Sequence, residues 1–406
     1  MGGADRGLAK RLATEQRHRL TYFRINNLLD ISTECSTIAH VRKDENELGV
    51  RIASARRGVG LTQEECATQV GMDRSALAKI EIGRRGVSAT ELVQFAQVFD
   101  MRVEWFFDDA PQAVLSRRQA AEPGASSPSV DRFTERLARE VEFLQRTGGI
   151  ELAATPAMPF PETVEQAEDA ATEARGRMGY DREEPSTELS KRVASLGLLV
   201  FSWELGDSGA DGASILLEQG GVAVVNGSYQ TGRRRLTLAH ELGHYLFGDE
   251  YSTDWSVVGT LAPTREKRID LFARSVLLPS AAMESRWRGG DNTRVDAVCL
   301  ASEYRVDMTT LARRLDELGV ASPEESALVR ATRTRQSDIV ELGLLVADEL
   351  APPMLPDAYV KAVLNVYRSE QVTAARALGL LLDTWQEEDL PDLHTLPADA
   401  VWSFVS

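Results

Sequence analysis

The segment 238–245 carries the residues of this chain that are best suited to metal chemistry. It reads Leu-Ala-His-Glu-Leu-Gly-His-Tyr, so His240 and His244 stand four residues apart with Glu241 between them. On a helix this spacing puts both imidazoles on one face, where they can bind one metal ion, and Glu241 faces the same site. The whole chain has only five histidines, so the pattern is unlike a chance occurrence. It predicts a zinc site rather than two ordinary helix histidines.

A hydrolytic zinc site also needs a third protein ligand and an open position for water. Glu266 stands 22 residues after His244, and Asp270 follows on the same face of a predicted helix over 266–277. Asp270 is suited to accept the second N–H of a metal-bound histidine. Glu266 also belongs to a charge run, Arg-Glu-Lys-Arg over 265–268, so the spacing alone leaves open a ligand and a solvated surface residue.

These residue types together are suited to hydrolysis of a peptide or amide bond. Zinc held by two nitrogens and a carboxylate acidifies water and polarises a carbonyl, while Glu241 would carry the proton to the leaving amine. Histidine and carboxylate ligands also accept Mn²⁺ or Fe²⁺, so zinc is the expected metal and these two are its alternatives. The donor for the developing oxyanion is not identified, because Tyr245, Tyr251 and Arg274 are near the motif only in sequence.

A second constellation lies in 47–107, where the pattern predicts several short helices. Thr62 and Glu65 have the spacing of a capping box at the start of one helix. Asp73 can cap the next helix, predicted over 74–82, and this arrangement is that of a helix-turn-helix. The stretch 74–85 has four basic residues and one acidic residue, and this local positive charge is what a DNA-reading face requires.

The charge of the whole chain excludes a protein that coats nucleic acid with its entire surface. Lys plus Arg number 46 and Asp plus Glu 62, a net charge of −16, so any DNA contact must be local. Hydrophobic residues at 43% exclude a fully disordered chain. No apolar run approaches the roughly 18 residues that span a bilayer, and the first ten residues are polar; we therefore expect no membrane segment and a cytoplasmic location.

The elements that position these residues indicate a mostly helical α+β chain. Strand-like segments at 196–203, 214–218 and 222–226 predict a small sheet just before the histidine helix, and a Pro/Ala/Ser/Gly-rich stretch marks a linker. The predicted order is an N-terminal extension (1–46), an all-α helix-turn-helix domain (47–107), a linker (108–130), a central zincin-like α+β domain (131–320) and a C-terminal helical domain (321–406). We expect the last of these to be a helical cap or self-association surface, with partner docking as the alternative.

The central motifs resemble the ImmA/IrrE family of metallopeptidases. The resemblance rests on Arg-Arg-Arg-Leu-Thr-Leu-Ala-His-Glu-Leu-Gly-His over 233–244, the Glu266-x-x-x-Asp270 pair, the run to Leu-Leu-Pro at 277–279, and Gly212. It implies that His240, His244 and Glu266 bind zinc and that Glu241 is the general base. It also implies that the protein acts on repressors, because members of that family cleave and inactivate them.

The earlier segment is similar to the phage-repressor, or Xre-type, helix-turn-helix family. The resemblance rests on the order Leu-Thr-Gln-Glu-Glu at 61–65, Val-Gly at 70–71 and Lys-Ile-Glu-x-Gly-Arg-Arg at 79–85. It implies that Arg74, Ser75 and Lys79 face base edges in the major groove of an operator. It further implies phosphate contacts by Gln63, Arg56, Arg84 and Arg85, and a homodimer. The alternative is the same fold used only for protein contact.

Two hypotheses follow for the whole chain. The first is a DNA-targeted zinc endopeptidase that cleaves a repressor-type protein, either an operon partner or its own linker, and so controls transcription. The second is a transcriptional autorepressor of antitoxin or phage-immunity type, with little or no proteolytic activity and a sensing or structural metal site. The metal ligands by themselves do not separate these two.

Overall fold

The computed structural model places the chain in two compact units, residues 1–109 and 110–406. The structure describes residues 45–59, 61–99, 103–106, 115–119, 128–206, 210–248, 262–344 and 348–393. The predicted N-terminal extension therefore lies outside the described residues, apart from its last two positions.

The first unit is a small helical domain. It contains α3 (Glu45–Gly58), α4 (Gln63–Val70), α5 (Arg74–Glu81), α6 (Ala89–Val98) and the 3₁₀ helix η1 (Val103–Phe106). The capping box predicted at the start of α4 is present: the Thr62 side chain accepts from the Glu65 amide, and the Glu65 side chain accepts from the Thr62 amide. Asp73 is the N-cap of α5 as predicted, but its side chain makes no capping hydrogen bond.

The two faces of α5 have opposite environments. Leu77 and Ile80 are fully buried in the core of the first unit, where Phe95 and Phe99 stack with ring centroids 5.7 Å apart. Arg74, Ser75 and Lys79 are exposed on the other side of the same helix. The apolar spacing of α5 thus fixes which of its side chains are available to a partner.

A four-stranded sheet forms the centre of the second unit. Its strands are β1 (Leu115–Gln119), β2 (Leu198–Trp203), β3 (Ala210–Leu216) and β4 (Gly221–Asn226), in the order β1-β3-β4-β2. The β2–β4 pair is parallel, and β1–β3 and β3–β4 are antiparallel. Strands β2 and β4 are buried almost throughout, which agrees with their continuous apolar sequence.

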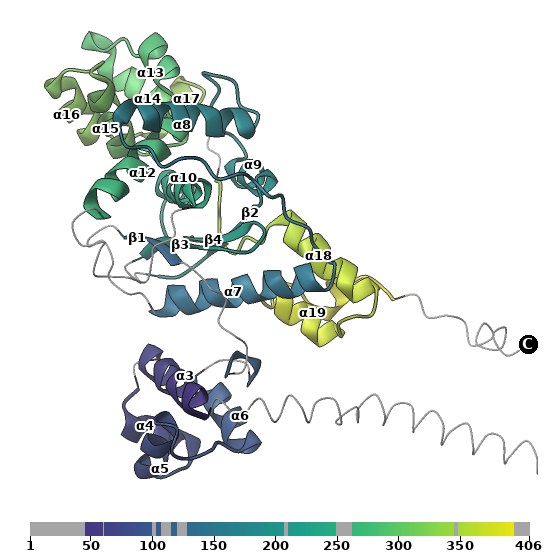
Figure 1. Ribbon diagram of the computed structural model, residues 1–406. Helices are drawn as coiled ribbons and strands as arrows, with labels where there is room; N and C mark the ends of the chain where they lie inside the picture. Colours follow the sequence, from purple (N-terminus) through teal and green to yellow (C-terminus); the bar gives the residue numbers. More distant parts are fainter. Residues whose placement is uncertain are drawn as a thin grey trace, which may run out of the picture. The chain divides into compact units, whose positions relative to one another are not determined.

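Alternate residues of the sheet enter two different cores. Leu198, Val200, Ala223 and Val225 pack with α10 (Thr231–Phe247) and α12 (Ala262–Leu277), whereas the intervening residues pack with α7 (Pro128–Arg146) and α18 (Asp357–Arg368). Figure 1 shows α10 and α7 on opposite faces of the sheet. The remaining elements of this unit are α8 (Val164–Arg177), α9 (Leu189–Ser195), α13 (Ser280–Arg286), η2 (Gly290–Asn292), α14 (Thr293–Glu303), α15 (Met308–Leu318), α16 (Pro323–Ala331), α17 (Gln336–Glu341), α19 (Ala374–Leu380) and η3 (Glu387–Asp389).

Two segments differ from the sequence expectation. Strand β1 lies inside the range predicted as a linker, because the free edge of β3 offers backbone partners that the weak apolar pattern of Leu-Ser-Arg-Arg-Gln does not reveal. Residues beyond 321 were expected to form a separate helical domain. Their buried side chains instead complete both cores of the second unit, and Met354 forms a backbone bridge with Ser202 of β2.

Candidate metal centre and nucleic-acid interface

Helix α10 carries the predicted metal motif through the interior of the second unit. It ends at Gly248, whose φ of 54° lies in the left-handed region that glycine adopts without steric cost. His240 and His244 are each 2% exposed, and Glu241 is fully buried. The helix expected to carry the two histidines is confirmed, and it spans Thr231–Phe247.

Glu266, in the second turn of α12, brings its carboxylate to both imidazoles. Its Oε2 lies 3.3 Å from His240 Nε2, and its Oε1 lies 3.8 Å from His244 Nε2. The two Nε2 atoms are 3.1 Å apart. Neighbouring ligand atoms of a tetrahedral zinc ion lie about 3.4 Å apart, given metal–ligand distances near 2.1 Å. These three residues, whose donor atoms all lie within 4.8 Å of one another, therefore fit a single zinc ion.

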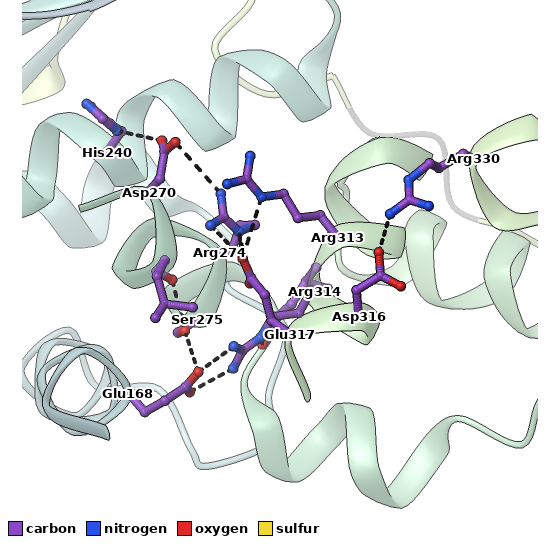
Figure 2. Close-up of polar contacts among 12 residues, drawn as sticks. Glu168, His240, Asp270, Arg274, Ser275, Arg313, Arg314, Asp316, Glu317 and Arg330 are labelled. Carbon is purple, nitrogen blue, oxygen red and sulfur yellow. Dashed lines mark hydrogen bonds and ion pairs between the residues drawn. The ribbon is translucent and has the colours of Figure 1, made fainter. Parts of the chain in front are cut away.

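Asp270, one turn beyond Glu266, contacts the other side of the first imidazole. Its Oδ1 lies 3.1 Å from His240 Nδ1 (Figure 2). An Nδ1–H that donates to this carboxylate leaves Nε2 as the nitrogen that can bind a metal. The structure thus places Asp270 where the sequence argument expected an outer carboxylate.

Glu241 is held by a residue that the sequence analysis did not identify. Ser214 of β3 donates from its Oγ to Glu241 Oε2 over 2.6 Å. The strand lies this close to α10 because position 212 is glycine: a Cβ there would lie 2.5 Å from Thr237 Cγ2 and 2.8 Å from Val224 O. Ser214 is a single serine in an apolar strand and belongs to no recognisable sequence motif. Its contact with Glu241 is therefore visible only in the folded chain.

A second glycine allows the close packing of the two ligand-bearing helices. A Cβ at Gly243 would lie 2.9 Å from Ile269 Cγ2 and 3.1 Å from Phe272 Cδ1, both on α12. Such distances are shorter than ordinary carbon contacts, so a larger residue would push α12 and its Glu266 away from the histidines. Gly243, inside the histidine motif, therefore allows α10 and α12 to pack closely.

Two residues near the motif in sequence have other partners in the fold. The Tyr245 hydroxyl donates to Leu196 O over 2.8 Å, and burial raises the pKa of Tyr245. Arg274 is bonded to Glu317 of α15. Neither is therefore assigned as an oxyanion donor, and Tyr251 lies outside the described residues.

On the first unit, several predicted DNA contacts are exposed side chains. Arg74, Ser75 and Lys79 share the outer face of α5, and Arg84 is exposed just after it. Arg85 is partly buried and its Nη2 lies 2.6 Å from Glu91 Oε1, at the start of α6. The structure thus brings four of the predicted residues together on an accessible surface.

Arg56 and Gln63 have intramolecular partners instead. The Nε of Arg56 donates to Glu81 Oε1 over 2.6 Å, and its Nη1 donates to Leu61 O over 2.7 Å. Gln63 Nε2 donates to Glu81 Oε2 over 2.7 Å. The bond to Glu81 raises the pKa of Arg56. These bonds hold α3, α4 and α5 together, a role that the sequence did not indicate, so the phosphate contacts of Arg56 and Gln63 stay a prediction.

Comparison with known families finds two domain matches. Residues 47–104 match a helix-turn-helix domain, and residues 193–316 match the IrrE N-terminal-like domain. The second match contains the histidines, Glu241, Ser214, Glu266 and Asp270. None of the helices in the described part of the chain combines the length and hydropathy needed to cross a lipid bilayer.

Three similar proteins each match a minor part of this chain. A transcriptional regulator in the ATPase CF(0) region of Rhodospirillum rubrum is 30% identical over 77 residues, which cover 19% of this chain and 68% of that protein. An HTH-type transcriptional regulator of Sinorhizobium medicae is 28% identical over 105 residues, covering 26% of this chain and 68% of that protein. The solved restriction-modification controller protein C.AhdI of Aeromonas hydrophila is 32% identical, over 16% of this chain and 98% of its own, with a TM-score of 0.16.

Proposed function

Because this chain belongs to the helix-turn-helix transcriptional regulators and joins that domain to an ImmA/IrrE-like peptidase domain, we propose that it is a zinc-dependent endopeptidase that acts on a repressor-type protein. Transcription would then be controlled by destruction of that protein. The helix-turn-helix domain would bring the peptidase to the operator that the substrate occupies.

The observation that carries this proposal is the convergence of four side chains from two helices. His240, His244 and Glu266 offer three donors at zinc-ligand spacing, and Glu241 lies on the same helix as the two imidazoles. A set of three protein ligands would be typical of catalytic rather than structural zinc sites, because structural sites use four. Both imidazoles and Glu241 are buried, whereas the carboxylate of Glu266 is partly exposed.

The chain's own residues have separable tasks in this chemistry. A zinc ion bound here supplies Lewis acidity, which polarises a carbonyl and acidifies water. His240, His244 and Glu266 would hold that ion, and Asp270, 3.1 Å from His240 Nδ1, would fix the orientation of the His240 imidazole. The carboxylate of Glu241 takes a proton from water and returns it to the leaving amine, so its unprotonated form starts the reaction. Ser214 holds this carboxylate in one orientation.

The substrate is either a partner repressor or this chain's own segment 108–130. The chain's own segment is within reach of the site, because β1 lies inside it and pairs with β3. In that pairing Ser116 stands opposite Ser214, the residue bonded to Glu241. A peptide strand at this edge of the sheet therefore lies beside the general base, and cleavage there would separate the two units.

An intact-mass time course tests the peptidase. The purified chain is incubated with zinc, alone and with each repressor-type protein encoded beside its gene. The wild type is compared with Glu241→Gln, which keeps all three proposed metal ligands but loses the base. We expect fragments only with wild-type protein and zinc, and their masses identify the cleaved bond. A rate that does not change with protein concentration would indicate cleavage of the chain's own linker.

Failure of this experiment has a definite meaning. If no fragment forms from any candidate while operator binding and regulation by Glu241→Gln equal those of the wild type, the endopeptidase proposal is wrong. The chain would then act as an autorepressor of antitoxin or phage-immunity type. The metal site would in that case be a sensor or a structural element.

We also propose that the first unit reads an operator as a homodimer. Arg74, Ser75 and Lys79 would contact base edges, and Arg84 and Arg85 would contact phosphates. The support is the exposure of Arg74, Ser75 and Lys79 on α5, opposite the buried Leu77 and Ile80, and the exposure of Arg84 just after this helix. A dimer presents two such faces to two half-sites, which a monomer cannot do.

Binding to DNA from upstream of the chain's own gene tests this surface. Lys79→Ala is expected to weaken binding by about 1–3 kcal/mol if the lysine reads a base edge. The matched control is Lys361→Ala, an exposed lysine of α18 in the second unit, which should bind like the wild type. Equal affinity of both variants would contradict the proposed surface, and the stoichiometry of the complex by light scattering tests the dimer.

A further inference from the structure

A chain of alternating charges leads away from the metal centre toward α15. Figure 2 shows His240 followed by Asp270, Arg274 and Glu317, with Arg313 beside the last of these. Asp270 Oδ1 contacts His240, and its Oδ2 lies 4.0 Å from Arg274 Nη1. Asp270 and Arg274 stand four residues apart on α12, so their side chains share one face of that helix.

Glu317 holds the Arg274 guanidinium from the opposite side. Arg274 Nε donates to both carboxylate oxygens of Glu317 at 3.0 Å, and Nη2 lies 2.7 Å from Oε1. The arginine side chain is only 3% exposed, so it lacks the freedom of a surface arginine. Two-point bonds between a guanidinium and a carboxylate fix direction as well as distance. Glu317 therefore determines where Arg274 points, and Arg274 points at Asp270.

We propose that Glu317 and Arg274 are positioning residues of the metal centre. Glu317 fixes Arg274, Arg274 fixes the carboxylate of Asp270, and Asp270 sets the orientation of the His240 imidazole. This inference rests on the proposed function, because it takes His240 to be a zinc ligand. It extends the site to α15, and Glu317 lies one residue beyond the region that matches the IrrE N-terminal-like domain.

The neighbours of Glu317 on α15 make similar bonds that do not lead to the site. Asp316 pairs with Arg330 of α16 at the surface. Arg314, fully buried, donates to Glu168 of α8 and to Leu278 O. Glu168 in turn accepts from Ser275 of α12. The Arg314–Glu168 pair thus joins α15 to α8 with burial comparable to that of the Arg274–Glu317 pair, but neither partner contacts Asp270 in Figure 2.

Zinc affinity of the full-length chain tests the proposal. Glu317→Gln removes the charge that holds Arg274 and is expected to raise the zinc dissociation constant about tenfold, at the low end of the effect of outer-shell changes. The affinity is measured by competition with a chromophoric chelator. The visible absorption bands of the Co²⁺-loaded protein, which report ligand geometry, should shift as well. Glu317→Asp, which keeps the charge but withdraws it by one methylene, is the second variant should the first fold poorly.

Glu168→Gln is the matched control for a purely structural effect. It breaks the other buried arginine–carboxylate pair of α15, so it should lower the melting temperature while leaving zinc affinity and the Co²⁺ spectrum unchanged. If Glu317→Gln and Glu168→Gln change zinc affinity equally, or if neither changes it, the positioning role is wrong.

A double-mutant cycle then tests whether Glu317 acts through Asp270. In an Asp270→Asn background the tenfold effect of Glu317→Gln should vanish, because the carboxylate it positions is gone. Equal effects in both backgrounds would contradict the proposed route. A wild-type chain that binds no zinc, or whose zinc binding is unaffected by loss of His240, would overturn the proposed function together with this inference. Zinc binding that requires His240 but is indifferent to Glu317 would overturn this inference alone.

Discussion

The carboxylate of Glu241 is oriented by a hydrogen bond from Ser214. The hydroxyl of Ser214 donates over 2.6 Å to Oε2, and both residues are buried. A hydrogen bond to a charged group is worth about 1.5–3 kcal/mol in a protein. A base that is oriented before substrate binds loses less freedom in the transition state. Ser214 is therefore expected to act on the rate of cleavage and not on metal binding.

Substitution of this serine separates the two effects. Ser214→Ala should slow formation of the cleavage fragments about tenfold or more, by loss of one charge-assisted bond, while zinc affinity stays at the wild-type value. The control is Ser202→Ala in β2, another buried strand serine, whose Oγ donates to Leu350 O. A Ser202→Ala protein as slow as Ser214→Ala would indicate that general loosening of the sheet, not orientation of the base, limits the rate.

The thiol of Cys66 reports the packing of the first unit. Burial raises the pKa of Cys66 from 9.0 to about 11. At pH 8 the thiolate fraction is then about a hundredfold lower than in the unfolded chain, and alkylation by iodoacetamide should be slower by at least that factor. Peptide mapping of the folded and the urea-unfolded chain measures both rates. Equal rates would contradict the buried position of this residue.

The same pKa shift predicts how stability depends on pH. The folded pKa is raised, so the contribution of Cys66 to stability is complete below pH 9 and is lost between about 9 and about 11, where only the unfolded chain carries the thiolate. A Cys66→Ala variant should lack this alkaline component in its urea midpoint. If the urea midpoint of both proteins declines identically at alkaline pH, the decline comes from groups other than Cys66.

At the scale of elements, the candidate metal centre depends on how closely α10 and α12 pack. The two histidines come from α10 and the carboxylates from α12, so the donor distances are set by the separation of the helices. Gly243 is the point of contact, since a Cβ there would lie 2.9 Å from Ile269 and 3.1 Å from Phe272. Neither helix alone can form the site.

An alanine at this contact should therefore impair folding and metal binding together. Gly243→Ala is expected to destabilise the second unit by about 1–3 kcal/mol, the usual cost of overpacking, and to weaken zinc binding. Gly176→Ala in α8 is the control: nothing lies within 4 Å of its added Cβ, so it should be neutral or stabilise by about 0.5–1 kcal/mol. Urea unfolding followed by tryptophan fluorescence measures both, because five of the six tryptophans lie after residue 109. A Gly243→Ala protein as stable as Gly176→Ala would contradict this packing.

At the scale of the whole molecule, the two units have separate cores. The core of the first unit is built from α3 to α6 and η1. In the second unit the sheet is covered on both faces, so removal of the helices near the C-terminal end would expose Leu199, Phe201, Val222 and Val224. The C-terminal helices thus stabilise the sheet that carries Ser214, independently of any partner that they bind.

Separate cores predict separate unfolding transitions with different responses to zinc. Calorimetry of the full chain should show two transitions, and removal of zinc by a chelator should lower only the one that belongs to the second unit. A free zinc concentration a hundredfold above the dissociation constant stabilises that unit by about 2.7 kcal/mol. Operator affinity should be unaffected by the chelator. A single unfolding transition, or two transitions that both shift when zinc is removed, would contradict the independence of the two cores.

The sequence by itself determined the local features of this protein. The spacing of the two histidines and Glu241, the capping box of Thr62 and the apolar stripe of α5 depend only on neighbours a few residues away, and the helices form as those patterns predict. The small sheet and the helix of Glu266 could be predicted for the same reason. The sequence alone did not establish Glu266 as a metal ligand, because its spacing from His244 fits a solvated surface residue equally well.

Only the tertiary structure decided which distant residues meet. Ser214 reaches Glu241 from another strand, Arg56 and Gln63 turn to Glu81, and Glu317 reaches Arg274 from a helix 43 residues away in sequence. Single serines, arginines and glutamates have many suitable partners in a chain with 62 acidic residues, so no spacing rule selects among them. The selection comes from close packing, such as that at Gly212 and Gly243, which brings particular side chains within bonding distance and excludes the others.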